Sequence, residues 1–325
     1  MIDNNNNNNR SSAFFMNGGA GRMLCSIPAL ELFQEENPND DFIIVCEGGT
    51  EFYKGHPTLH ERVYDNHHKD LFKDKLKNRN CFSPEPYRVW EYYNQKCNLA
   101  QAFDVAINNK GIRKLKTSSI YLSQEEFLGG IHTIKEVKEK TKKSKVIVFQ
   151  PFGRSSHVHN EVRHDTSGRS LTLADTVEII KALQKDYAVL LMAEQQIDTD
   201  KLGIKEPLAV PQNISLRQWS GIIAEADYFV GIDSVGQHIA NSFGKKATVI
   251  IGSTYPENIS YPESSTFDVL DFGADRRKYD PIRLTQDEVS MRNNESLLQL
   301  NKPAIEHIIK SIKTNLESKS AKNGK

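Results

Sequence analysis

One stretch in the second half of the chain, Tyr228–Thr254, restricts the possible fold more than any other. It begins with the apolar run Tyr228–Ile232, which is typical of a buried strand, and a short polar turn then leads into a helix. A second apolar run, Ala247–Ile251, follows the helix and ends at Gly252. Strand, tight turn, helix and strand make a βαβ unit, and such units build parallel sheets that are covered by helices. The stretch therefore predicts an α/β protein.

The turn between these two strands carries the side chains of a candidate ligand site. Asp233, Ser234 and Gly236 follow the first strand directly, and His238 falls in the first turn of the helix. In open parallel sheets, ligands bind beyond the carboxyl ends of the strands, beside helix N-termini whose free N–H groups suit phosphate. This composition suits a phosphorylated, sugar-like ligand. Each residue also has a simpler interpretation: Asp233 and Ser234 as helix N-caps, Gly236 as a turn glycine, and His238 as a packed helical residue.

Composition and charge argue against several other classes of protein. The 325 residues include 42 acidic and 42 basic side chains, so no net field attracts nucleic acid or an anionic membrane. No apolar run approaches the roughly 20 residues of a membrane helix, and Phe14–Met16 is too short for the core of a signal peptide. We therefore expect a cytoplasmic protein. The cysteines form no C-x-x-C pair, which argues against a zinc site or a redox dithiol.

The order of the apolar runs divides the chain into two α/β halves. Residues 1–12 are rich in asparagine, and we expect this tail to be disordered. We expect a first domain over residues 13–140 and a second over residues 145–300, each opening with a strand, a glycine-bearing loop and a helix. A final amphipathic helix is expected over residues 303–317, because four isoleucines recur there at helical spacing.

Individual apolar runs predict the elements of each half. Gln124–Lys145 is rich in lysine and glutamate and has no strong apolar pattern, which indicates a surface helix followed by a linker. Ser118–Leu122 is expected to be a last strand or an extended exit from the first domain. The other expected strands and helices are Ala13–Met16, Arg22–Glu36, Phe42–Cys46, Val146–Phe149, Leu173–Lys185, Ala188–Met192, Leu216–Ala224 and Pro303–Leu316.

Four segments resemble, in order, sequence motifs of the heptosyltransferases of glycosyltransferase family 9. They are Gly21–Leu30, Ile120–Glu126, Val146–Gly153 and the run G-x-D-S-x-x-x-H-x-A that begins at Gly231. Each match alone is weak, but their shared order and spacing favour a real relationship. The resemblance implies the GT-B fold, with two Rossmann-like domains facing each other across a cleft and the C-terminal helix crossing back to the first domain. It also implies a nucleotide-diphosphate sugar as donor co-substrate and no metal.

One position departs from the motif of this family. The resemblance places an aspartate, proposed as the base that activates the acceptor hydroxyl, where this chain has Arg22. A guanidinium stays protonated near neutral pH and cannot take that proton. Glu47, which ends the second strand, is the candidate replacement base, and Asp104 is a weaker one. Arg22 suits a phosphate or an anionic group of the acceptor instead.

The resemblance extends the donor site to other strand ends. Arg169 corresponds to a basic residue that contacts the donor diphosphate, and Glu194 follows a strand where an acid can hold a sugar or ribose hydroxyl. The candidate donor-binding residues are Gln150, Gly153, Arg154, Ser155, Arg169, Glu194, Asp233, Ser234, Gly236 and His238, with Glu47, His238 and Arg22 as candidate catalytic residues. A capping role for Glu194 and a solvated position for Arg154 are the simpler alternatives.

A histidine cluster nearby does not make a convincing metal site. His157, His159 and His164 include an H-x-H pair, but no acid or cysteine at a usual ligand spacing completes the set. We interpret this segment as a polar loop and expect no metal.

The resemblance implies an inverting glycosyltransferase, with a lipopolysaccharide or another surface glycan as the expected acceptor. Lysine clusters at Lys110–Lys116 and Lys138–Lys145 leave open a phage-type enzyme that glycosylates a hydroxylated DNA base. Arg22 leaves open a third possibility, a catalytically inactive protein that binds nucleotide sugars.

Overall fold

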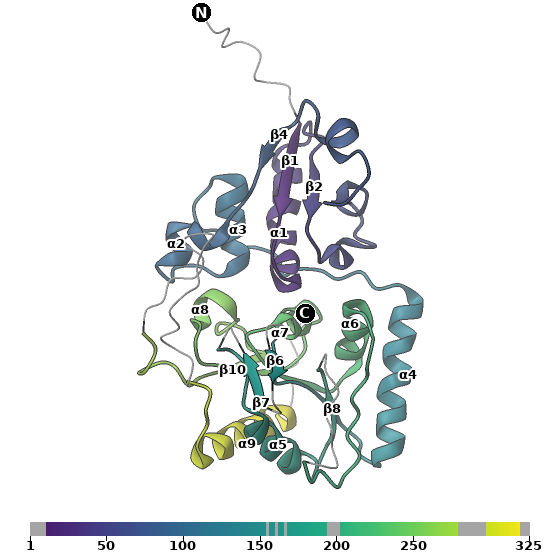
Figure 1. The fold of residues 1–325 in the computed structure, drawn as a ribbon, viewed down its shortest axis with the longest axis vertical. Helices are drawn as coiled ribbons and strands as arrows, with labels where there is room; N and C mark the ends of the chain where they lie inside the picture. Colours follow the sequence, from purple (N-terminus) through teal and green to yellow (C-terminus); the bar gives the residue numbers. More distant parts are fainter. Residues whose placement is uncertain are drawn as a thin grey trace, which may run out of the picture. The chain divides into compact units, whose positions relative to one another are not determined.

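The fold is given by a computed structural model, which describes residues 11–318 apart from 154–155, 160–161, 166–167, 194–201 and 279–296. The described residues form two compact units, residues 11–121 and residues 122–318. Each unit has a parallel sheet with helices packed on it (Figure 1). This arrangement confirms the predicted α/β class.

The first unit contains a four-stranded sheet in the order β3-β2-β1-β4, with all neighbours parallel. The chain adds β2 and β3 on one side of β1 and then returns to place β4 on the other side. The strands are β1 (Ser12–Met16), β2 (Ile43–Cys46), β3 (Val63–Asp65) and β4 (Asn80–Phe82). The helices are α1 (Ala20–Glu36), α2 (Trp90–Tyr93) and α3 (Leu99–Asn108), with short 3₁₀ turns η1 (Thr50–Tyr53), η2 (His60–Arg62) and η4 (Pro86–Arg88) and a π turn η3 (Leu71–Leu76).

The second unit contains a five-stranded parallel sheet in the order β11-β10-β9-β5-β8. Its strands are β5 (Val146–Gln150), β8 (Ala188–Leu191), β9 (Tyr228–Ile232), β10 (Ala247–Ile251) and β11 (Phe267–Asp271), and a hairpin is formed by β6 (Ser156–His159) and β7 (Val162–Asp165). Its helices are α4 (Gln124–Thr141), α5 (Leu173–Leu183), α6 (Leu216–Glu225), α7 (Val235–Ser242), α8 (Pro256–Ile259) and α9 (Lys302–Glu317).

Helix α4 is the expected surface helix, and it is grouped with the second unit, which begins at residue 122. It packs on α6, beside which it runs in Figure 1. A methyl group on Gly130 would lie 2.3 Å from the carbonyl oxygen of Gly221, so the two helix backbones meet without side chains between them. Arg217 donates to both carboxylate oxygens of Glu126, at 2.5 and 2.6 Å, and thereby lowers the pKa of Glu126 to about 2.

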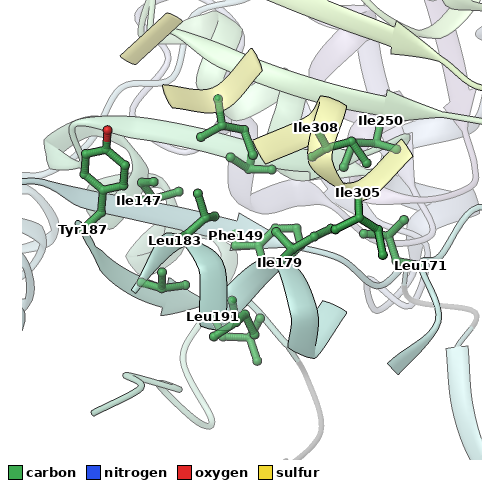
Figure 2. Close-up of a cluster of buried hydrophobic side chains, with 14 of the residues drawn as sticks. Ile147, Phe149, Leu171, Ile179, Leu183, Tyr187, Leu191, Ile250, Ile305 and Ile308 are labelled. Atoms are coloured by element: carbon green, nitrogen blue, oxygen red, sulfur yellow. The ribbon is translucent and has the colours of Figure 1, made fainter. Parts of the chain in front are cut away.

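Helix α9 also belongs to the second unit. Its isoleucine stripe lies in a buried cluster with Ile147 and Phe149 of β5 and with residues of α5 (Figure 2). This packing places the apolar stripe of α9 in the core of the second unit. Among the described residues, no helix combines the length and the apolar character that crossing a membrane requires.

Candidate functional site

In the sheet of the second unit, the side on which the chain adds new strands changes between β5 and β9. The chain adds β8 on one side of β5, then β9, β10 and β11 on the other. At such a reversal the loops leaving the two strands diverge, which leaves room for a ligand beyond their carboxyl ends. Gln150 ends β5 beside Gly231 of β9, and Asp233 follows β9 directly. The sequence therefore places its candidate residues at the point in this sheet where ligands usually bind.

Gln150 fixes the turn between β9 and α7. Its amide nitrogen donates to the Ser234 hydroxyl at 3.2 Å, and its carbonyl oxygen accepts the backbone N–H of Gly236 at 3.0 Å. A methyl group on Gly236 would lie 2.4 Å from that oxygen, so the close approach requires glycine. The N-terminus of α7 has no side-chain cap.

Arg169 and Asp233 join the loop after β7 to the loop after β9. One guanidinium nitrogen of Arg169 lies 3.4 Å from a carboxylate oxygen of Asp233. The Asp165 carboxylate accepts the backbone N–H groups of Arg169 at 3.1 Å and Ser170 at 2.7 Å. The Ser170 hydroxyl in turn accepts the N–H of Gly153 at 2.9 Å. These bonds hold a partly exposed guanidinium beside the carboxyl ends of β5 and β9.

His238 is buried in the first turns of α7. Its Nδ1 is hydrogen-bonded to the Tyr261 hydroxyl at 2.7 Å, and the two rings meet edge to face. Burial lowers the pKa of the imidazole to about 4; the negative charge of Asp233 raises it, and Arg169 lowers it further. His238 is therefore neutral at pH 7. In that state it interacts with an anion through an N–H group rather than through a positive charge.

The second unit thus brings together seven of the predicted donor-site residues: Gln150, Gly153, Arg169, Asp233, Ser234, Gly236 and His238. Arg154, Ser155 and Glu194 lie outside the described residues. His157, His159 and His164 lie on the strands of the β6–β7 hairpin, and their side chains are likewise outside the described part. Within that part, no group of three or more His, Cys, Asp or Glu residues is arranged to hold a metal ion.

Sequence reasoning missed Asp165, Ser170 and Tyr261. Asp165 and Ser170 act through loop hydrogen bonds that no local motif encodes. Tyr261 follows α8, and it reaches His238 because β9 and β10 are neighbours in the sheet. A search that included the loop after β10 would have found it.

The remaining candidates lie in the first unit. Glu47 follows β2 and is exposed, with its backbone N–H bonded to the Met16 carbonyl at 3.2 Å. Asp104 is fully buried and accepts hydrogen bonds from Arg113 and Asn108. The carboxylate of Asp104 is committed to these partners, which argues against its role as a base. Arg22 is buried near the start of α1.

Comparison with known proteins identifies the fold. No protein-family model and no curated protein sequence matches this chain. Solved structures do match. The crystal structure of a glycosyl transferase family 9 protein from Veillonella parvula DSM 2008 has a TM-score of 0.64 and 13% identity, over 94% of this chain and 97% of its own.

Two proteins from E. coli have the same fold. The ADP-heptose lipopolysaccharide heptosyltransferase II has a TM-score of 0.61 and 12% identity, over 94% of this chain and 98% of its own. TibC, an iron-containing dodecameric glycosyltransferase from the enterotoxigenic strain H10407, has a TM-score of 0.56 and 12% identity, over 95% of this chain and 77% of its own. The chain therefore has the GT-B fold of family 9 glycosyltransferases and heptosyltransferases, which is the fold that its motifs predict.

Proposed function

We propose that this protein is an inverting glycosyltransferase that moves a sugar from a nucleotide-diphosphate sugar to a hydroxyl group of a surface glycan or lipopolysaccharide. The observation that carries the proposal is the presence of two bonded pairs, Gln150 with Ser234 and Arg169 with Asp233, beside β5 and β9, where the side on which strands are added changes. A helix N-terminus and a partly exposed guanidinium at this place suit a diphosphate, and a carboxylate and a hydroxyl suit a sugar.

In the proposed reaction, the oxygen of the acceptor hydroxyl attacks the anomeric carbon of the donor. The bond from that carbon to the diphosphate breaks, and its electron pair leaves with the nucleoside diphosphate. Arg169, the first N–H groups of α7 and the neutral imidazole of His238 stabilise the charge that develops on the leaving group. We include Arg154, Ser155 and Glu194 in the donor site on the basis of the sequence motifs. The acceptor proton passes to a carboxylate, for which Glu47 is the candidate named by the sequence.

Proteins of similar fold support the choice of donor. TibC has been solved in complex with ADP-D-beta-D-heptose, and the E. coli heptosyltransferase WaaC with ADP. An ADP-linked heptose is therefore the first donor to test, followed by sugars linked to UDP and GDP.

Binding of activated sugars tests the proposal directly. We expect calorimetry to detect at least one of ADP-heptose, UDP-glucose and GDP-mannose as a ligand. We expect Arg169→Met to weaken that binding by roughly 10-fold to 100-fold, because a hydrogen bond to a charged group contributes about 1.5–3 kcal/mol. Lys135→Met, on the exposed side of α4, is the matched loss of a positive charge and should leave affinity unchanged.

Two results would contradict the proposal. One is that the wild-type protein binds none of these sugars, and the other is that Arg169→Met binds the donor as tightly as the wild type. Binding without release of nucleoside diphosphate, in the presence of a range of glycan acceptors, would instead identify an inactive nucleotide-sugar-binding protein.

A further inference from the structure

In the first sheet, too, the side on which the chain adds strands reverses, and two charged residues meet at that place. The chain adds β2 and β3 on one side of β1 and β4 on the other, so the loops after β1 and β4 diverge. Arg22 lies in the first turn of α1, just after the β1 loop, and Glu85 lies three residues after β4 ends. A Nη atom of Arg22 is 3.3 Å from an Oε atom of Glu85. This ion pair therefore lies at the place in the first sheet that favours ligand binding.

The guanidinium of Arg22 is held firmly but is incompletely bonded. Only 4% of the side chain is exposed, and the guanidinium lies over the rings of Tyr87, at 4.8 Å, and Phe103, at 5.6 Å. The Arg22 side chain also lies across Gly18, where a methyl group would be 2.7 Å from its Cδ. None of its three nitrogens makes a hydrogen bond of good geometry within the described residues.

A buried charge is costly unless a partner of opposite sign lies close to it. Glu85 supplies that partner for Arg22. The same carboxylate oxygen accepts the backbone N–H of Tyr87 at 3.3 Å, so two groups orient the side chain. Yet 23% of the Glu85 side chain is exposed, which leaves the carboxylate open to a ligand. The Glu85 carboxylate is thus oriented by two groups of the protein and is partly exposed to solvent.

Glu47 differs from Glu85 in each of these respects. It follows β2, which lies on the opposite side of β1 from β4, so it does not come from either of the two strands between which the order reverses. It is exposed, whereas catalytic groups work best when their neighbours hold them in one geometry.

We propose that Glu85, positioned by Arg22, is the carboxylate that takes the proton of the acceptor hydroxyl; this inference rests on the proposed function. As the acceptor oxygen forms its bond to the anomeric carbon, its O–H proton passes to an oxygen of Glu85. The electron pair of the broken bond leaves with the nucleoside diphosphate. Arg22 is a positioning residue in this reaction, because it acts through Glu85.

The test compares three glutamine variants of the first unit: Glu85→Gln, Glu47→Gln as the rival, and Glu61→Gln as a control on an exposed turn. The probe is ADP-heptose, or the donor from the panel above that binds, with water and with glycan extracts as acceptors. Nucleoside-diphosphate release at saturating donor gives turnover, and calorimetry gives donor affinity. We expect Glu85→Gln to lower turnover by roughly 100-fold or more while donor affinity stays within about twofold. Glu61→Gln should match the wild type, and Glu47→Gln should lose less turnover than Glu85→Gln.

A conservative variant separates catalysis from structure. Glu85→Asp, which keeps the carboxylate, should recover part of the rate.

The inference is overturned if Glu85→Gln turns over at the wild-type rate, or if its loss matches a loss of folded protein while Glu85→Asp shows no recovery. It is also overturned if Glu47→Gln shows the large loss instead. A wild-type protein that binds and turns over no activated sugar contradicts the proposed function itself, and this inference with it.

Discussion

The imidazole of His238 shows how burial sets the chemistry of a single residue. It lies on α7 among Asp233, Arg169 and Tyr261, and its pKa falls to about 4 mainly because the charged form would lose its hydration. A bound diphosphate would place negative charge nearby and favour the charged form. At pH 7 the imidazole is neutral in the free protein, and it can donate an N–H group to a departing diphosphate.

Burial of His238 makes the stability of the fold depend on pH. The unfolded chain takes up this proton near the ordinary value of 6.5, whereas the folded chain takes it up only near 4. Between these values the unfolded state binds more protons, so the contribution is complete above pH 6.5 and is lost as the pH falls toward 4. We expect a loss of about 2 kcal/mol between about pH 7 and pH 4.5.

His238→Gln should lack this component. Chemical denaturation of both proteins across the pH range measures it, because other titrating groups contribute equally to the two curves. Parallel curves for the two proteins would show that the imidazole titrates normally in the folded state.

At the scale of elements, the clearest predictions concern strands that are buried on both faces. The runs Tyr228–Ile232 and Ala247–Ile251 coincide with β9 and β10, because a central strand of a parallel sheet is apolar throughout. β11 (Phe267–Asp271) was not predicted, since this edge strand is only partly buried and mixes Asp with apolar residues. The βαβ signal likewise located Asp233 and His238, whereas Glu85 and Tyr261 come from loops whose position depends on the completed sheets.

For helix α4, the contact with α6 was not predicted, for a different reason. Its contact with α6 is made by backbone at Gly130 and Gly221, and hydrophobic periodicity does not detect such a contact. From the sequence, Gly130 only lowers the helix propensity of α4, whereas in the structure it allows α4 and α6 to approach closely. Adjacent glycines in α4 make this interpretation testable.

Gly130→Ala and Gly129→Ala should change stability in opposite directions. At Gly130 the new methyl group would meet the Gly221 backbone at 2.3 Å, so α4 and α6 must separate, and we expect a loss of about 1–3 kcal/mol. At Gly129 nothing lies within 4 Å, and alanine should add about 0.5–1 kcal/mol through its greater helix preference. Urea denaturation of the two variants measures both effects. Equal changes in the two would show that the helices do not meet at Gly130.

At the scale of the whole molecule, the described residues form two units, and in the parallel sheet of each unit the chain adds strands first on one side of the opening strand and then on the other. The charged groups at the two reversals differ in kind. The second sheet presents Arg169, Asp233 and a helix N-terminus, which suit a diphosphate-linked sugar. The first presents a carboxylate supported by a buried arginine, which suits a hydroxyl group that must lose a proton. In the proposed reaction, the second unit binds the donor, and the first unit supplies the carboxylate that takes the acceptor proton.

This division predicts where a donor stabilises the protein. A ligand that binds only the folded state stabilises the part that it contacts, by about 2.7 kcal/mol at 100 times its dissociation constant. We expect ADP-heptose, or the donor that binds in its place, to slow amide hydrogen exchange in β9, α7 and the loop around Arg169, with smaller changes in β2 and β3 of the first unit. Mass spectrometry of peptides with and without donor measures this pattern, and Arg169→Met at the same donor concentration should show a reduced effect. Protection confined to the first unit would place the donor on the other sheet and exchange the roles that we assign to the two halves.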